Sequence, residues 1–102
     1  MGAHPFHQAV SGATLAAAFD EAVQQAQREY GENSYSGSVG MKEEVLLFEE
    51  PPRSRDEARA RADELIAADD ERIRDKWGPA GALPLHPVDG QPHWLLFGWV
   101  AS

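Results

Sequence analysis

The dipeptide Asp89-Gly90 lies between two apolar runs and constrains the fold more than any other feature. Asp-Gly supplies the two positive backbone angles of a two-residue type I′ turn, so the flanking runs should form an antiparallel hairpin. We expect its arms over residues 82–86 and 93–100. This register would place His86 opposite His93.

The second arm of this hairpin is apolar on both faces. Trp94 and Leu96 alternate with Leu95 and Phe97 along it. A strand that is apolar on both faces is central in its sheet, with one face packed on helices. The sequence does not identify what packs on the other face, and the surface of a partner protein is one possibility.

Two segments have the patterns of helices. Residues 15–30 place apolar side chains at intervals of three and four, and Gly31 would end this helix. Residues 54–77 begin with the capping box of Ser54-Arg55-Asp56-Glu57. The acids at 69–70 interrupt its apolar stripe and indicate either a kink or a new helical turn.

Two further short strands are expected over residues 35–41 and 45–48, and residues 1–13 have no periodicity. The order helix-strand-strand-helix-strand-strand predicts an α+β two-layer sandwich. Both helices would lie on one face of a mainly antiparallel four-stranded sheet. Residues 1–13 would form an irregular N-terminal arm and residues 14–102 a single domain.

The charge balance excludes several classes of function. Lysine and arginine number 9 against 17 aspartates and glutamates, a net charge of −8. This sign disfavours direct binding of nucleic acid or of an anionic membrane.

Several sequence features of enzymes and membrane proteins are missing. The chain has no cysteine and no apolar run long enough to span a bilayer. It also has no phosphate-binding loop and no order of residues typical of a catalytic triad. We expect a cytoplasmic, non-enzymatic protein without a cofactor.

The negative charge is uneven along the chain. Residues 1–50 hold eight acids and two bases, a net charge of −6, whereas residues 51–102 carry −2. A concentrated acidic surface can imitate nucleic acid and block a basic protein. A nucleic-acid-mimicking inhibitor is therefore one alternative function, beside simple solvation of the surface.

Histidines and arginines offer two further candidate sites. If His86 and His93 face each other, their imidazoles could hold zinc, copper or nickel, and a metal-binding protein is the second alternative. A polar hairpin tip is the other interpretation. The basic cluster consists of Arg53, Arg55, Arg59 and Arg61. It predicts a salt-bridged outer helix face, with an anion site as the alternative.

Aromatic side chains supply the leading hypothesis. A domain of this size cannot bury all its tyrosines and tryptophans with their polar atoms satisfied, and exposed Trp and Tyr often anchor protein partners. Trp77 and Phe97 are expected in the core. The predicted contact surface consists of Tyr35, Glu43, Glu44, Trp94 and Trp99. The sequence thus predicts a small acidic module that binds another protein, or a second copy of itself in a homodimer.

Three elements carry a resemblance. These are Tyr35-Ser36-Gly37-Ser38-Val39, Lys76-Trp77-Gly78-Pro79-Ala80-Gly81 and the C-terminal Leu96-Phe97-Gly98-Trp99-Val100-Ala101-Ser102. Together they resemble a group of small uncharacterised prokaryotic and phage proteins. The resemblance implies no catalytic residues.

Overall fold

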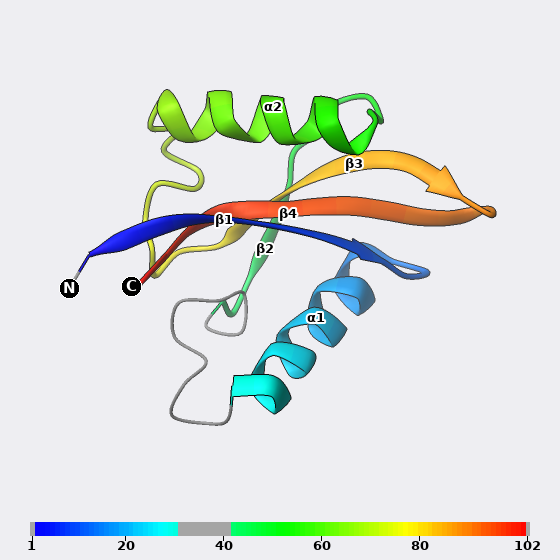
Figure 1. The fold of residues 1–102 in the computed structure, drawn as a ribbon, viewed down its shortest axis with the longest axis horizontal. Coiled ribbons are helices and arrows are strands. Elements are labelled where there is room, and N and C mark those ends of the chain that lie inside the picture. The colour runs from blue at the N-terminus through cyan, green and yellow to red at the C-terminus, as the bar shows by residue number, and fades with distance from the viewer. Residues whose placement is uncertain (1, 31–41, 102) are drawn as a thin grey trace.

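The computed structural model describes residues 2–30 and 42–101. In chain order its elements are β1 (Ala3–Ser11), α1 (Leu15–Tyr30), β2 (Val45–Leu47), α2 (Arg55–Ala67), β3 (Ala80–Val88) and β4 (Gln91–Ala101). The strands form one sheet in the order β1-β4-β3-β2. Strand β2 runs parallel to β3, and the other two pairs are antiparallel, so the sheet is mixed. The predicted α+β class, with two helices and four strands, is confirmed (Figure 1).

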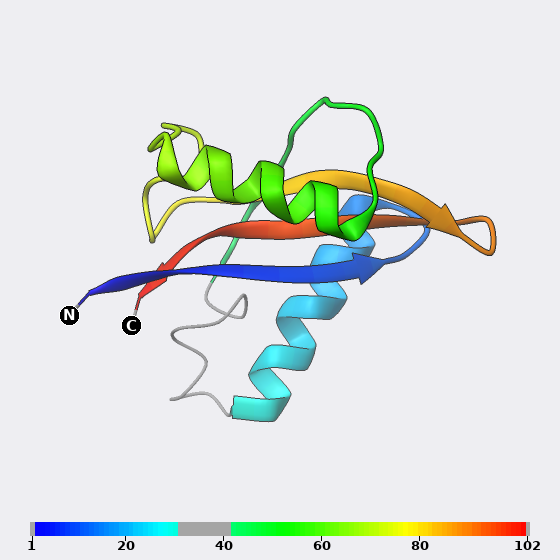
Figure 2. The ribbon, with the colours of Figure 1, turned by 45° about the horizontal axis from the view of Figure 1, so that its top comes forward.

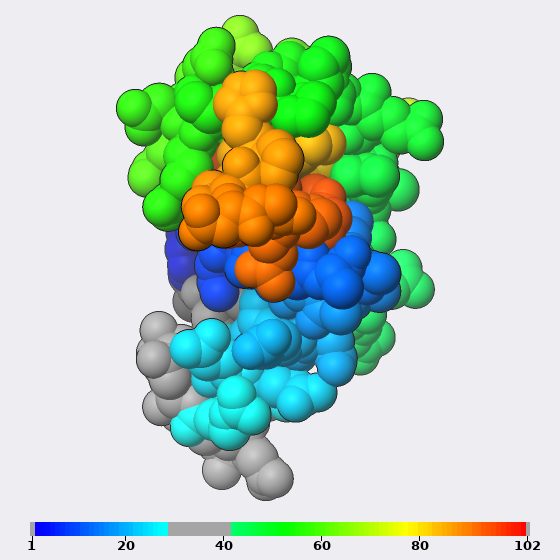
Figure 3. Space-filling model, turned by 90° about the vertical axis from the view of Figure 1, so that its right-hand side faces the viewer, coloured from blue at the N-terminus to red at the C-terminus, as the bar shows by residue number. Residues whose placement is uncertain are grey.

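The hairpin of β3 and β4 forms where the sequence predicts it. Asp89 and Gly90 have φ angles of 52° and 77°, both positive as a type I′ turn requires. Val88 pairs with Gln91 next to this turn. Figure 3 looks onto the end of the molecule where this turn lies, with α2 above it and α1 below.

A β-bulge changes the register beyond the turn. Between Leu85 and Val88 the register shifts, so that His93 pairs with Leu85. The predicted pairing of His86 with His93 is therefore wrong. The amide of His86 instead donates to the carbonyl oxygen of Arg53 at 2.9 Å, on the side of β3 away from β4.

The N-terminal segment is a strand, and the prediction of an irregular arm over residues 1–13 is wrong for its described part. Strand β1 pairs with β4 along its whole length, from Ala3 opposite Ala101 to Ser11 opposite His93. Strand β4 thus has neighbours on both sides, and its predicted central position is confirmed. Pro5 is compatible with β1 because this strand lies at the edge of the sheet.

The two helices lie on opposite faces of the sheet, so the prediction that both cover one face is wrong (Figures 1 and 2). On one face α2 buries Ala58, Ala62 and Leu65 against a cluster that includes Leu83, Leu95 and Phe97. On the other face α1 buries Phe19, Ala22 and Ala26 against Ala80, Ala82 and Leu96. A strand that is apolar on both faces needs cover on both, and α1 supplies the cover that the sequence leaves open.

Helix α2 begins as predicted and ends earlier. The Ser54 hydroxyl accepts a hydrogen bond from the Glu57 amide, and the Glu57 carboxylate accepts one from the Ser54 amide. The helix ends at Ala67 and not near Trp77, and Asp69 has a φ of 55°. This left-handed residue follows the C-cap Ala68. The acids at 69–70 therefore mark neither a kink within α2 nor a new turn of it, because the helix has already ended.

Trp77 lies beyond the end of α2, and its expected core position is wrong. It is 70% exposed, whereas Phe97 is fully buried as predicted. Strand β2 corresponds to the predicted strand over residues 45–48. The strand expected over residues 35–41 lies outside the described residues.

Candidate functional site

The two tryptophans predicted to bind a partner do not share one surface. Trp94 packs against the cluster that α1 buries on its face of the sheet, which we call the α1 cluster. Trp99 packs against the cluster under α2, the α2 cluster. The two indoles therefore lie on opposite faces of the sheet, and both are half-buried. Glu43 and Glu44 are exposed at the approach to β2. Tyr35 lies outside the described residues. The structure therefore does not join the tryptophans into one contact surface.

The histidines have other partners. The His93 ring donates from Nδ1 to the carbonyl oxygen of Gln91 at 2.8 Å, and His86 is exposed. His7 lies 2.8 Å from the Asp63 carboxylate through its Nε2 atom. Within residues 2–30 and 42–101, no three histidine, aspartate or glutamate side chains gather closely enough to hold a metal ion.

Lys42 is a buried charged residue that is held by backbone carbonyl groups. Its ammonium group donates to the carbonyl oxygens of Lys76 and Gly78 at 3.0 and 3.1 Å. Burial lowers the pKa of Lys42, and the nearby charge of Asp75 acts in the opposite direction. The contacts connect the segment before β2 to the turn before β3.

The open edge of β1 is the strongest candidate for a functional site. In an antiparallel ladder, alternate residues direct both backbone groups to the same neighbour. The Gly12 amide donates to the Pro92 carbonyl oxygen at 3.3 Å, which fixes this alternation. The backbone amide and carbonyl groups of Phe6, Gln8 and Val10 therefore form the hydrogen bonds to β4.

The other set of β1 residues directs its backbone away from the sheet. His7, Ala9 and Ser11 belong to this set, and so does Pro5, which has no amide hydrogen to offer. In the sheet order β1 has β4 as its only neighbour within the described chain. The amides of His7, Ala9 and Ser11 thus form a row of donors with no strand beside them.

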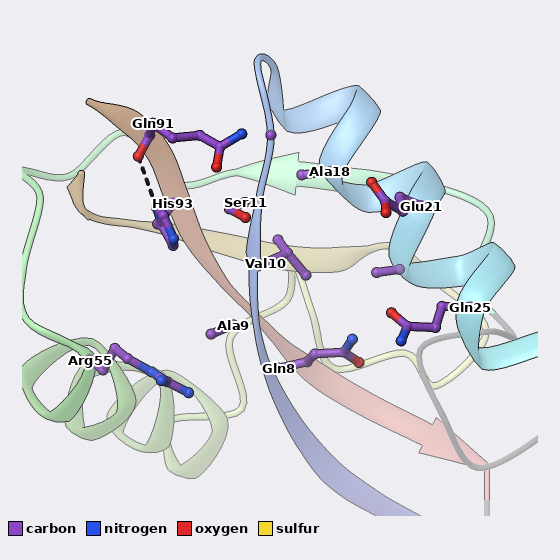
Figure 4. Close-up of a pocket in the computed structure, with 12 residues that line it drawn as sticks. Gln8, Ala9, Val10, Ser11, Ala18, Glu21, Gln25, Arg55, Gln91 and His93 are labelled. Carbon is purple, nitrogen blue, oxygen red and sulfur yellow. Dashed lines mark hydrogen bonds between the residues drawn. The ribbon is translucent and has the colours of Figure 1, made fainter. Parts of the chain in front are cut away.

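Two hollows follow this open edge. The larger has a volume of about 510 Å³ and is lined by residues 8–11 of β1, by Gly12, by α1 and by Arg55. The smaller, of about 310 Å³, is lined by residues 7–9 of β1 and by Arg55 and Arg59 of α2. Because they share Gln8, Ala9 and Arg55, we describe them together as the edge groove. Figure 4 shows β1 between α1 and the first turn of α2.

The two walls of the edge groove carry opposite charge. Glu21 lies on the α1 wall beside Ala18 and Ala22. Arg55 and Arg59 lie on the α2 wall, one helical turn apart, together with Asp56. A strand bound between the walls would meet an acid on one face and two guanidinium groups on the other.

The predicted salt-bridged face of α2 forms only in part. Arg53 and Arg61 both bind Glu50, at 2.7 and 3.0 Å. The hydrogen bond from Arg61 is the largest of the effects that lower the pKa of Glu50. In the part of the chain that the structure describes, Arg55 and Arg59 form no ion pair. Their charges remain available in the groove.

The edge groove was not predicted from the sequence, because residues 1–13 carry too little alternation to indicate a strand. The signal that could have found it is the two-sided apolar pattern of β4. A central strand needs a neighbour on each side, and β3 accounts for only one of them.

The chain matches no known protein-family model, no curated protein and no solved structure. Neither of the two helices in the described ranges is long and apolar enough to cross a membrane.

Proposed function

We propose that this protein is a small protein-binding module that captures an extended segment of another protein by adding it as a strand to β1. The observation that carries the proposal is the row of outward amides on His7, Ala9 and Ser11, three residues that line the edge groove. An exposed row of this kind is a template for pairing with another chain.

The length of the open row fits a short peptide segment. Five residues, from His7 to Ser11, lie on the part of β1 that the groove follows. At about 3.4 Å per residue, they match an extended segment of roughly 17 Å. Pro5 interrupts the donors on the N-terminal side, which limits pairing there.

The charged walls favour a different protein over a second copy of this chain. Antiparallel self-pairing centred on Ala9 would place Glu21 of both copies on one face and Arg55 of both copies on the other. Like charges gathered on the same face of a shared sheet oppose association. The proposal thus keeps the predicted protein-binding function and changes the predicted surface. It places the protein in the cytoplasm, with which the absence of cysteine is compatible.

Selection from a random linear-peptide library tests the proposal, with Ala9→Pro as the edge-blocking variant. Proline at residue 9 removes an outward amide and spares every hydrogen bond to β4, as Pro5 already does. We expect selected peptides to bind the wild-type chain and to lose binding to Ala9→Pro, with the variant's circular dichroism unchanged.

A second measurement covers the case in which Ala9→Pro does not fold. The selected peptide is methylated on alternate backbone nitrogens, which blocks strand pairing and leaves its side chains intact. Methylation of one alternate set should abolish binding, and methylation of the other should leave it. Equal binding by both methylated peptides, or selection of no peptide at all, would overturn the proposal.

A further inference from the structure

The opposite charges of the two groove walls specify the kind of segment that fits between them. We infer that the captured segment carries an acidic side chain opposite Ala9 and a basic side chain at the next position. This inference rests on the proposed addition of a strand to β1.

The position opposite Ala9 faces the arginines. Side chains directly opposite each other in neighbouring strands lie on the same face of the sheet. Ala9 packs against the α2 cluster, so the residue opposite it also points to the α2 face. The methyl group of Ala9 leaves space there, and Arg55 and Arg59 line that space.

The arginines are suited to a carboxylate. Guanidinium groups bind carboxylates through paired, charge-assisted hydrogen bonds. Asp56 also lines this part of the groove, so two positive charges stand against one negative charge. Asp63, further along α2, is held by His7 at 2.8 Å. The local charge is therefore positive, although the whole chain carries −8.

The next position along the captured strand faces α1, because side chains alternate between the faces. Gln8 and Val10 occupy this face of β1, and Glu21 stands across from them with Ala18 and Ala22. The aliphatic part of a lysine can lie along this wall of the groove while its ammonium group reaches Glu21, which is exposed.

Two peptides that differ at one position test the inference. Both are acetylated and amidated, with the sequences Thr-Val-Lys-Glu-Lys-Val-Thr and Thr-Val-Lys-Gln-Lys-Val-Thr. The glutamine peptide carries more positive charge, so attraction to an acidic protein alone would make it bind more tightly. We expect the opposite order, with the glutamate peptide bound about threefold to fivefold more tightly in an NMR titration.

Two protein variants with the same change in net charge provide the control. Arg59→Gln removes a guanidinium group from the groove, and Arg28→Gln removes one from the exposed face of α1, outside both hollows. Arg59→Gln should abolish most of the preference for the glutamate peptide. Arg28→Gln should retain it.

The outcomes separate this inference from the function on which it rests. Equal or tighter binding of the glutamine peptide, or the same effect of both arginine variants, would overturn the charge pattern. If binding still depended on the open edge, as shown by loss in Ala9→Pro, strand addition would stand. Absence of binding by either peptide at millimolar concentration would overturn the charge pattern, and the library selection would then decide the proposed function separately.

Discussion

The Gly12 amide donates to the carbonyl oxygen of Pro92 at 3.3 Å, immediately beyond the end of β1. Together with the register of β1 on β4, this bond shows which backbone groups of β1 reach β4 and which face outward. A shift of one residue would exchange the two sets. The outward orientation of the His7, Ala9 and Ser11 amides thus follows from the register of the β1–β4 ladder, which this bond continues.

Gly81→Ala should destabilise the fold. A Cβ atom at this position would lie 2.6 Å from Cζ of Phe97 and 3.0 Å from Cγ2 of Ile73, both fully buried. Overpacking of this kind costs about 1–3 kcal/mol in the free energy of unfolding. Urea denaturation measures the loss.

Gly90→Ala is the matched comparison. Nothing lies within 4 Å of a Cβ atom there, so the cost comes only from the φ of 77° and should be about 1 kcal/mol. An equal or larger loss for Gly90→Ala would contradict the packing of Gly81 against Phe97.

Trp77→Ala and Phe97→Ala should differ sharply. Trp77 is 70% exposed, and its replacement should change the free energy of unfolding by less than about 0.5 kcal/mol. Phe97 is fully buried and meets Phe48 edge-to-face at 5.2 Å between ring centroids. Its replacement should cost about 3–5 kcal/mol, or prevent folding. Thermal unfolding followed by circular dichroism would detect the difference, and a large loss in Trp77→Ala would speak against its exposed position.

Asp70 should contribute stability that acid removes. Hydrogen bonding to Arg72 lowers the pKa of Asp70 to about 2, whereas the pKa of an aspartate in an unfolded chain is about 3.9. A lowered folded-state pKa gives stability that is present above the unfolded value and is lost as the pH falls towards 2. The contribution should be about 1 kcal/mol, because Arg72 is half exposed to screening solvent.

Comparison with Asp70→Asn isolates this effect. The amide oxygen of asparagine can still accept the 2.9 Å hydrogen bond from the Arg72 amide, so the backbone turn is retained. The difference in unfolding free energy between wild type and variant should be constant above pH 5 and should shrink below about pH 4. A difference independent of pH would contradict the ion pair.

The sequence predicted the elements whose signals are local. The Asp89-Gly90 turn and the Ser54–Glu57 capping box each depend on residues within a few positions of one another, and both form as expected. The two-sided apolar pattern of β4 also predicted its central position correctly.

The features that the sequence did not predict depend on distant contacts. Strand β1 has little alternation of its own and is formed by pairing with β4, about 90 residues away along the chain. The bulge at His86 arises where the amide of this residue bonds to Arg53. The edge groove combines β1, α1 and α2, so neither its shape nor its opposite charges follow from any one segment.

Hydrogen exchange at the β1 amides tests the central claim most directly. In the free protein, the amides of Phe6, Gln8 and Val10 should exchange slowly, and those of His7, Ala9 and Ser11 should exchange rapidly. Addition of the Lys-Glu-Lys peptide should slow exchange at His7, Ala9 and Ser11 and leave the other set unchanged. Slow exchange of these three amides in the free chain, or no change on binding, would contradict an open edge that accepts a strand.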